Sequence, residues 1–153
     1  MNRRSQQIAI LAVALSMVLT AASAETGCVA GNCRNGQGTW IYDGDQQGQR
    51  YEGAFRRGQR HGHGVHHYTD GIYEGRWHRN KRRGQGTYQH QSGHRYTGEW
   101  RDDQPHGEGS FTHATGNQYV GDWQQGVRDG HGVMTRTDGS RYEGGWQNDQ
   151  YQG

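Results

Sequence analysis

Seven basic side chains fall in two short stretches of the sequence, and they are the residues best suited to bind an anion. They are Arg56, Arg57, Arg60, Arg79, Lys81, Arg82 and Arg83. The planar guanidinium group of arginine matches phosphate and carboxylate groups with two parallel hydrogen bonds. These seven residues are candidates for an anion-binding site, and the other interpretation is that they are solvated surface turns.

Charge is distributed unevenly along the chain. Residues 50–83 include nine basic residues against three acidic ones, a balance of +6. Residues 102–149 include eight acidic residues against three arginines, a balance of −5. A basic cluster adds about 1 kcal/mol per residue to binding at an acidic membrane surface. An acidic phospholipid is therefore one expected partner of the basic segment.

Groups arranged for catalysis are missing from the sequence pattern. Asp102 and Asp103 are adjacent carboxylates, but adjacent polar residues at a hairpin tip are typical of a solvated turn. The glycines recur as Gly-x-Gly with a further glycine seven residues later, which is neither a phosphate-binding loop nor a dinucleotide-binding motif. No serine lies in a nucleophile elbow. We expect a protein that is not an enzyme and has no cofactor.

A repeat determines the elements that carry these residues. The pattern aromatic-x-Gly-x-aromatic returns in steps of 22, 23, 23 and 23 residues, and a fixed period marks a repeat architecture. The five units, called units 1 to 5, start at Tyr51, Tyr73, Tyr96, Tyr119 and Tyr142. Rings and glycines alternate with charged residues, which predicts strands joined into hairpins by Gly-rich turns. We expect an all-β fold, an elongated single-layer antiparallel meander of β-hairpins with about ten strands.

The predicted core consists of aromatic rings. No leucine follows residue 24, and all sixteen Phe, Trp and Tyr residues lie beyond it. The expected core positions are Tyr51, Phe55, Tyr73, Trp77, Tyr96, Trp100, Tyr119, Trp123, Tyr142 and Trp146. Glycine inside a strand usually marks the close approach of another group. We therefore expect the rings of one hairpin to cover the bare glycine backbone of its neighbour.

The pattern Tyr-x-Gly-x-Trp-x-x-Gly-x-x-x-Gly-x-Gly resembles the MORN repeat, and residues 119–132 match it position for position. The resemblance covers residues 51–153, and a partial unit at residues 36–42 lacks the opening Tyr strand. Phe55 stands in the Trp position of unit 1. Three polar residues replace the glycine found at Gly58 and Gly126; they are Asn80, Asp103 and Asp149. The last unit stops at Gly153, so we expect it to lack its return strand.

Histidines crowd the second half of unit 1. They are His61, His63, His66 and His67. Imidazole is the commonest metal ligand, but the positions of His61 and His63 carry Arg83 and Gln85 in unit 2. This variation indicates outward-facing positions, so we expect no metal site, and metal binding by the histidines is the alternative.

The first 24 residues have the order of a secretory signal peptide. Arg3 and Arg4 precede an apolar run at residues 8–19, and Ala22-Ser23-Ala24 supplies the small residues before a cleavage after Ala24. The run is shorter than the about 20 residues that span a bilayer. We expect an exported protein, periplasmic or secreted, and a membrane anchor is the alternative.

Residues 25–50 are expected to form an N-terminal lip that contains the partial unit and both cysteines. An oxidising compartment allows Cys28 and Cys33 to form a disulfide. A metal or redox pair is the alternative, although two ligands are too few for a closed zinc site.

The resemblance implies a non-enzymatic module for protein-protein interaction or scaffolding. We expect an unidentified protein partner, or self-association through the open sheet edges. The alternative is peripheral binding to acidic phospholipid or another anionic surface through the basic hairpin tips. Nucleic acid is not an expected partner, because the chain without its leader has fifteen basic residues against fifteen acidic ones.

Overall fold

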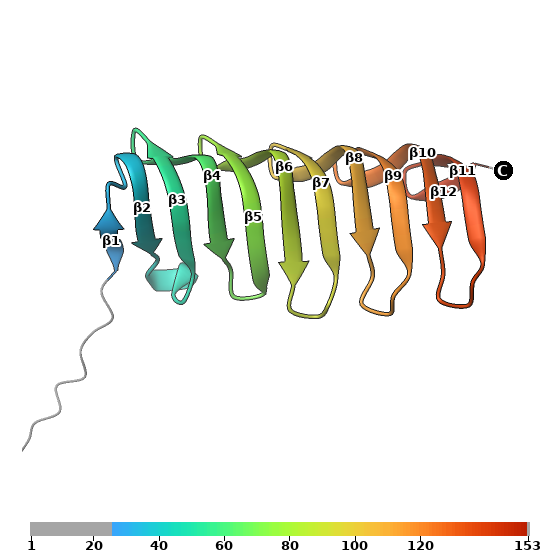
Figure 1. Cartoon of the computed structure of the whole chain (residues 1–153), viewed down its shortest axis with the longest axis horizontal. Coiled ribbons are helices and arrows are strands. Elements are labelled where there is room, and N and C mark those ends of the chain that lie inside the picture. Colours follow the sequence, from blue (N-terminus) through green and yellow to red (C-terminus); the bar gives the residue numbers. More distant parts are fainter. Residues whose placement is uncertain (1–25, 153) are drawn as a thin grey trace, which may run out of the picture.

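The protein is described by a computed structural model over residues 26–152, and these residues form one open antiparallel β-sheet of twelve strands (Figure 1). Each strand pairs with the strands before and after it in the sequence, which confirms the predicted meander. A short 3-10 helix, η1 (Gly44–Gln46), lies between the second and third strands. The strands are β1 (Gly27–Gly31), β2 (Asn35–Ile41), β3 (Arg50–Arg56), β4 (Gln59–His67), β5 (Gly71–His78), β6 (Lys81–His90), β7 (Arg95–Arg101), β8 (Gln104–Thr112), β9 (Gln118–Gln124), β10 (Val127–Thr135), β11 (Arg141–Gln147) and β12 (Gln150–Gln152).

The two ends of the sheet differ from the sequence-based expectation. Strand β1 takes the place of the opening strand that the partial unit lacks, and it pairs with β2. Strand β12 is the return strand of unit 5, and it places Tyr151 opposite Trp146. The expected strand number of about ten and the expected absence of a last return strand are therefore wrong. Three residues after the last turn are enough to continue the ladder.

Each of the five units has one two-residue turn between its two strands. These five turns form one edge of the sheet, called the tip edge. Both turn residues have positive φ, as in Arg79 at 50° and Asn80 at 68°. Type I′ turns require this geometry, and their twist matches that of the flanking strands. The second turn position is always Gly, Asn or Asp, which tolerate it best; these residues are Gly58, Asn80, Asp103, Gly126 and Asp149. The opposite edge holds the longer connections between units.

A line of glycines crosses the middle of the sheet from β2 to β11. Gly64 in β4 lies opposite Gly75 in β5, and Gly75 lies opposite Gly86 in β6. The complete line is Gly38, Gly53, Gly64, Gly75, Gly86, Gly98, Gly109, Gly121, Gly132 and Gly144. A Cβ atom at Gly86 would overlap the hydroxyl end of the Tyr73 ring. Only glycine allows the ring to lie this close to the backbone.

Tyrosine and tryptophan rings form a continuous core on one face of the sheet, called the ring face. The Tyr73 hydroxyl donates to the carbonyl oxygen of Arg76 at 3.1 Å, and Trp77 Nε1 donates to the carbonyl oxygen of Gly64 at 3.2 Å. The Tyr73 ring meets the rings of Trp77 and Trp100 edge-on, with centroids 5.1 and 5.3 Å apart. Each tyrosine thus covers a glycine of its own hairpin, whereas each tryptophan reaches the preceding hairpin.

The ten predicted core positions all lie on this face. Nine are buried, and Tyr142 near the end of the sheet is half-buried. Edge-on aromatic pairs each contribute about 0.5–1.5 kcal/mol beyond the area that they bury. The rings therefore replace the aliphatic core that the composition lacks.

Register shifts next to the glycine line bend the strands. They occur between Gly53 and Phe55 in unit 1 and between Gly75 and Trp77 in unit 2. An irregularity of this kind bends a strand and turns the side chains that follow it in a new direction. Figure 1 shows the strands curling over toward the tip edge.

Candidate functional site

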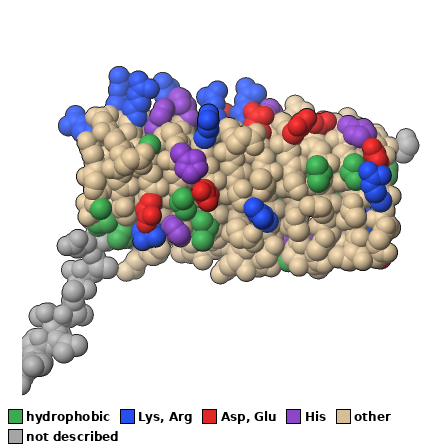
Figure 2. Space-filling model, in the orientation of Figure 1, with side chains coloured by type: hydrophobic (Ala, Val, Ile, Leu, Met, Phe, Trp, Pro, Cys, Tyr) green, Lys and Arg blue, Asp and Glu red, His purple; other side chains and the backbone are tan. Residues whose placement is uncertain are grey.

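Five of the seven predicted anion-binding residues are exposed along the tip edge of units 1 and 2, and we call them the basic edge. They are Arg56, Arg57, Arg79, Lys81 and Arg83. Figure 2 shows Lys and Arg side chains gathered along one edge over the first hairpins, with Asp and Glu side chains following them. The uneven charge of the sequence thus becomes a gradient along one edge of the molecule.

A hollow of about 380 Å³ lies between the first two tips, and three of its six lining residues belong to the basic edge. Arg56, Arg57 and Arg79 contribute guanidinium groups, and His61 and His78 lie beside them with ring centroids 4.9 Å apart. Loss of hydration and then the positive charges nearby lower the pKa of His78. Within residues 26–152 none of these three arginines forms an ion pair. Their guanidinium groups are available to an external anion.

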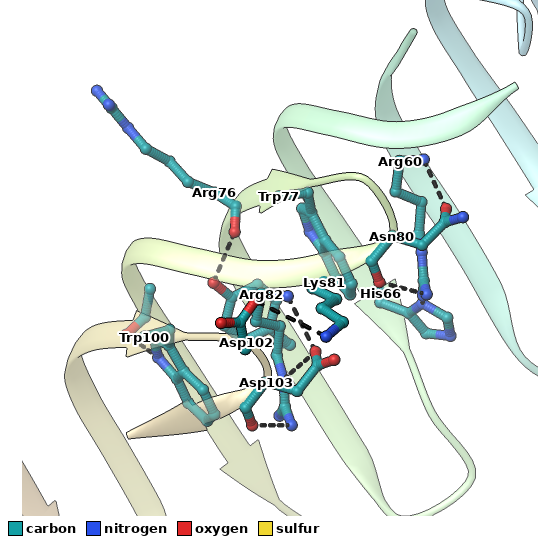
Figure 3. Close-up of polar contacts among 12 residues, drawn as sticks. Arg60, His66, Arg76, Trp77, Asn80, Lys81, Arg82, Trp100, Asp102 and Asp103 are labelled. Atoms are coloured by element: carbon teal, nitrogen blue, oxygen red, sulfur yellow. Dashed lines mark hydrogen bonds and ion pairs between the residues drawn. The ribbon is translucent and has the colours of Figure 1, made fainter. Parts of the chain in front are cut away.

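Arg60 and Arg82, the other two predicted residues, lie on the ring face instead (Figure 3). The guanidinium carbon of Arg82 lies 4.2 Å from the centroid of the Trp100 ring, and that of Arg60 lies 4.3 Å from the Trp77 ring. Arg82 Nη2 also donates to the carbonyl oxygen of Asp103 at 2.7 Å. Because their charges are used inside the fold, these two arginines hold neighbouring units together.

The adjacent carboxylates at the tip of unit 3 face separate cations. Asp103 Oδ1 lies 3.3 Å from Arg82 Nε, and Asp102 Oδ1 lies 3.8 Å from Lys81 Nζ. Both residues are also turn residues with positive φ. This geometry gives Asp102 and Asp103 structural roles.

His66 differs from the other histidines of unit 1 because it is buried, with 1% of its surface exposed. Its ring stacks on Tyr68 with centroids 4.0 Å apart. Arg60 Nη1 lies 2.6 Å from His66 Nδ1, and His66 Nε2 lies 3.0 Å from Gln49 Oε1. Arginine can only donate, so Nδ1 accepts and the ring is neutral with its proton on Nε2. Burial, and then the charge of Arg60, lower the pKa of His66 to about 3.

The remaining histidines of unit 1 are more accessible. His61 and His67 are half-buried, and His63 is exposed. Within the described part of the chain no three His, Cys, Asp or Glu side chains are placed to hold a metal ion.

The ring face opens into a groove of about 620 Å³ over units 3 and 4, called the ring-face groove. Most of its lining is apolar, from side chains that include Trp100, Pro105, Phe111, Tyr119, Trp123 and Met134. Burial, and then the nearby charge of Asp122, raise the pKa of Tyr119 to about 12, so its hydroxyl stays protonated at neutral pH. Arg128, Asp149 and Arg136 supply polar groups at the groove. Such a site suits a mainly apolar ligand that also carries a few polar groups.

Sequence reasoning missed this groove, although one signal was present. Pro105 is the only proline of the chain, and it stands where units 1, 2 and 4 carry Arg60, Arg82 and Arg128. The arginine at this position covers the tryptophan of the next unit, as Arg82 covers Trp100. A shorter side chain there leaves the ring face open.

Cys28 and Cys33 are joined by a disulfide at the β1–β2 hairpin, with Cα atoms 5.9 Å apart. The predicted signal peptide, residues 1–24, lies outside the described residues. Within residues 26–152 no helix combines the length and the apolar character needed to cross a membrane.

Comparison with known proteins agrees with the repeat geometry. A family model described as the MORN repeat matches residues 51–72, 73–95, 96–118, 119–141 and 142–153. These boundaries are those of units 1 to 5. No curated protein matches the chain.

Proposed function

The chain belongs to the MORN repeat family, whose repeats are generally non-catalytic binding modules, and from this premise we propose that it binds a protein partner through the ring-face groove. The groove combines a large apolar lining with a few polar groups, and an apolar recess of this kind is a usual place for binding. Elsewhere on the ring face, side chains of the protein itself cover the rings, as Arg60 covers Trp77 and Tyr68 covers His66.

The groove is the single observation that carries this proposal. Phe111 and Met134 are only half-buried within it, although both pack against the aromatic core. Removing such apolar surface from water is favourable by about 25 cal/mol for each Å², and this gain works against the entropy lost on association. The half-buried apolar side chains are therefore the expected contact points.

A matched pair of variants tests the proposal by affinity capture from the exported fraction of the source cells. Met134→Glu places a charge in the groove, whereas Val120→Glu places one on an exposed side chain of β9, of which 49% is accessible. We expect Met134→Glu to lose a protein that the wild type and Val120→Glu retain. Circular dichroism of both variants checks that each is folded. Capture of the same proteins by all three forms would refute binding in the groove.

The second candidate function is peripheral binding to an anionic surface through the basic edge. The observation that favours it is the hollow between the first two tips, which is lined by three exposed arginines that form no ion pair within residues 26–152. Acidic phospholipid is the proposed surface, because juxtaposed basic residues are attracted to acidic lipid head groups. This second site lies on units 1 and 2 and leaves the groove of units 3 and 4 free.

We also propose that the protein is exported, to the periplasm or beyond. The leader-like order of residues 1–24 and the pair Cys28 and Cys33 support this location. Amino-terminal sequencing of the mature protein tests it, and Glu25 is the expected first residue. A mature chain that still starts at Met1 would refute cleavage after Ala24.

A further inference from the structure

Three arginine side chains form the same contact between consecutive units. The guanidinium carbons of Arg60, Arg82 and Arg128 lie 4.3, 4.2 and 4.4 Å from ring centroids of the tryptophan in the following unit. The tryptophans are Trp77, Trp100 and Trp146. A guanidinium group at this distance over an indole ring is attracted by the negative face of the ring.

Each of these arginines is also tethered to the second residue of the next turn. The Nη2 groups of Arg60, Arg82 and Arg128 donate to main-chain carbonyl oxygens at 2.8, 2.7 and 3.1 Å. The acceptors belong to Asn80, Asp103 and Asp149. The side-chain oxygens of the same three residues accept from the main-chain N–H groups of the arginines. Arginine and Asx residue thus occur together as one clamp.

The interface between units 3 and 4 lacks both members of the clamp. Pro105 stands in the arginine position and Gly126 in the Asx position, while the turn keeps its hydrogen bond from Gly126 N to Pro105 O at 3.0 Å. The equivalent backbone bond in unit 2, from Asn80 N to Arg60 O, measures 3.1 Å. The turn hydrogen bond is therefore kept at both interfaces. The interface between units 3 and 4 lacks the side chains that would cover the ring, and Pro105 also lacks the main-chain N–H that the arginines donate to the Asx residue.

Trp123, the tryptophan of this interface, consequently has no guanidinium group from residues 26–152 over its ring. It is 9% exposed, whereas the three clamped tryptophans are 3–4% exposed. Pro105, Trp123 and Gly126 all line the ring-face groove. The groove therefore includes the place that an arginine fills at the other interfaces.

We propose that an arginine side chain of the protein partner fills this place, stacking its guanidinium group on Trp123 near the main chain of Gly126. The charged side chains that line the groove are Arg128, Arg136 and Asp149, and they belong to a stretch, residues 102–149, with eight acidic residues against three arginines. Arg128, which shares the groove, already has a carboxylate partner in Asp149 at 2.8 Å. The inference rests on the proposed function and names the group that the groove recognises.

Nuclear magnetic resonance of the indole N–H signals tests this site with argininamide as the probe. We expect argininamide to shift the Trp123 signal with saturation and to leave the signals of Trp77 and Trp146 in place, since Arg60 and Arg128 cover these two rings. Citrulline amide has the same shape without the charge, and we expect it to leave Trp123 unchanged. Equal shifts at all three tryptophans, or no saturable shift at Trp123, would overturn the proposal.

The double variant Pro105→Arg/Gly126→Asp provides the matched control, because it restores both members of the clamp. The response of Trp123 to argininamide should disappear in this variant, and a response equal to that of the wild type would also overturn the proposal. The wild-type titrations decide the question by themselves if the variant does not fold. If Met134→Glu loses its captured protein while argininamide leaves Trp123 unshifted, the proposed function survives and the arginine site is rejected.

Discussion

At the scale of single residues, His66 has the most unusual environment. It occupies the position that Tyr88, Phe111 and Met134 fill in the later units, and it is the one buried polar side chain of residues 26–152. Its neutral ring accepts a hydrogen bond from Arg60. A proton on Nδ1 would remove this acceptor and place a second positive charge beside the guanidinium group. Unit 1 is therefore sensitive to acid.

The pKa of His66 predicts how stability depends on pH. The unfolded chain takes up the proton near pH 6.5, whereas the folded protein takes it up only near pH 3. The contribution of neutral His66 to the free energy of unfolding is therefore fully present above about pH 6.5. It is lost as the pH drops toward 3, by about 1.4 kcal/mol per pH unit. Between pH 6.5 and 4.5, we expect the free energy of unfolding of His66→Phe to fall by about 2 kcal/mol less than that of the wild type, as measured by urea unfolding.

The control for this measurement is His131→Gln, which changes an exposed histidine on β10. It should follow the wild-type pH dependence because it keeps His66. The carboxylates that titrate in the same range are common to all three proteins, so they do not contribute to the difference. Identical slopes for the wild type and His66→Phe would show that His66 is not the group responsible.

Trp100 lies at the centre of the aromatic core and joins units 2 and 3, because its ring meets those of Tyr73 and Tyr96 edge-on. Its Nε1 donates to the carbonyl oxygen of Gly86 at 3.1 Å, and it is covered by the guanidinium group of Arg82. Truncation of a buried tryptophan costs about 3–5 kcal/mol, out of a total stability of about 5–15 kcal/mol. We expect Trp100→Ala to lower the melting temperature strongly, whereas Trp40→Ala, at a ring that is 37% exposed, should have a much smaller effect. Similar melting temperatures for the two variants would contradict this description of the core.

At the scale of strands and turns, most of the structure follows from the 23-residue period. Alternation of rings with charged residues predicts the strands, and a Gly, Asn or Asp at the same position of each unit predicts the tight turns. The direction of Arg60 and Arg82 could not be predicted in this way. The register shift in each hairpin turns these side chains onto the ring face, and no simple alternation of two includes such a shift.

The candidate sites were predictable to different degrees for the same reason. The basic edge follows from residues that lie next to turns, because a turn exposes its neighbours whatever the detailed register. The ring-face groove arises because Pro105 in unit 3 replaces the arginine that unit 2 carries as Arg82. The contact of that arginine with the tryptophan of the next unit joins two units, so neither sequence segment alone indicates it. The burial of His66 likewise depends on Gln49 and Arg60, which belong to different strands.

Substitution of a glycine in the glycine line is predicted to destabilise the protein much more than substitution of a glycine outside it. A Cβ at Gly109 would overlap the Tyr96 ring, whereas a Cβ at Gly145 would meet only the flexible side chain of Gln152, at 3.3 Å. Overpacking of a tightly packed site costs about 1–3 kcal/mol. We expect Gly109→Ala to be destabilised by at least this amount and Gly145→Ala to unfold close to the wild-type urea concentration. A tolerated Gly109→Ala would show that the ring can withdraw from the backbone.

At the scale of the whole molecule, the charge gradient along the tip edge gives the protein two different ends. Basic side chains gather over units 1 and 2, and acidic ones follow over the later units (Figure 2). The groove and the basic edge lie on different parts of this length. The two proposed binding sites therefore share no residues.

Reversal of charge at two tips tests the binding of an anionic surface. We expect the wild type to sediment with phosphatidylglycerol liposomes at low salt and to be released as salt rises, because exposed charges are screened beyond about 10 Å at 0.1 M ionic strength. Arg57→Glu/Arg79→Glu should lose this sedimentation. Arg95→Glu/Arg141→Glu changes the net charge equally at exposed positions outside the basic edge and should keep most of it.

Surface changes of this kind cost less than about 0.5 kcal/mol each, so both double variants should melt with the wild type. Equal loss of sedimentation in the two variants would assign the attraction to net charge alone. Sedimentation of the wild type with neutral phosphatidylcholine liposomes would likewise reject an electrostatic site at the basic edge.

The sequential strand order also determines how the molecule responds to mechanical force. The strands run across the long axis and the first and last strands lie at its two ends (Figure 1). A force applied to the two ends therefore acts on the hydrogen bonds of one terminal strand pair at a time, and these bonds break in turn. We expect the sheet to yield hairpin by hairpin, and each complete unit of 22 or 23 residues to release about 75 Å of chain. We expect the protein under tension to lengthen in steps of one hairpin.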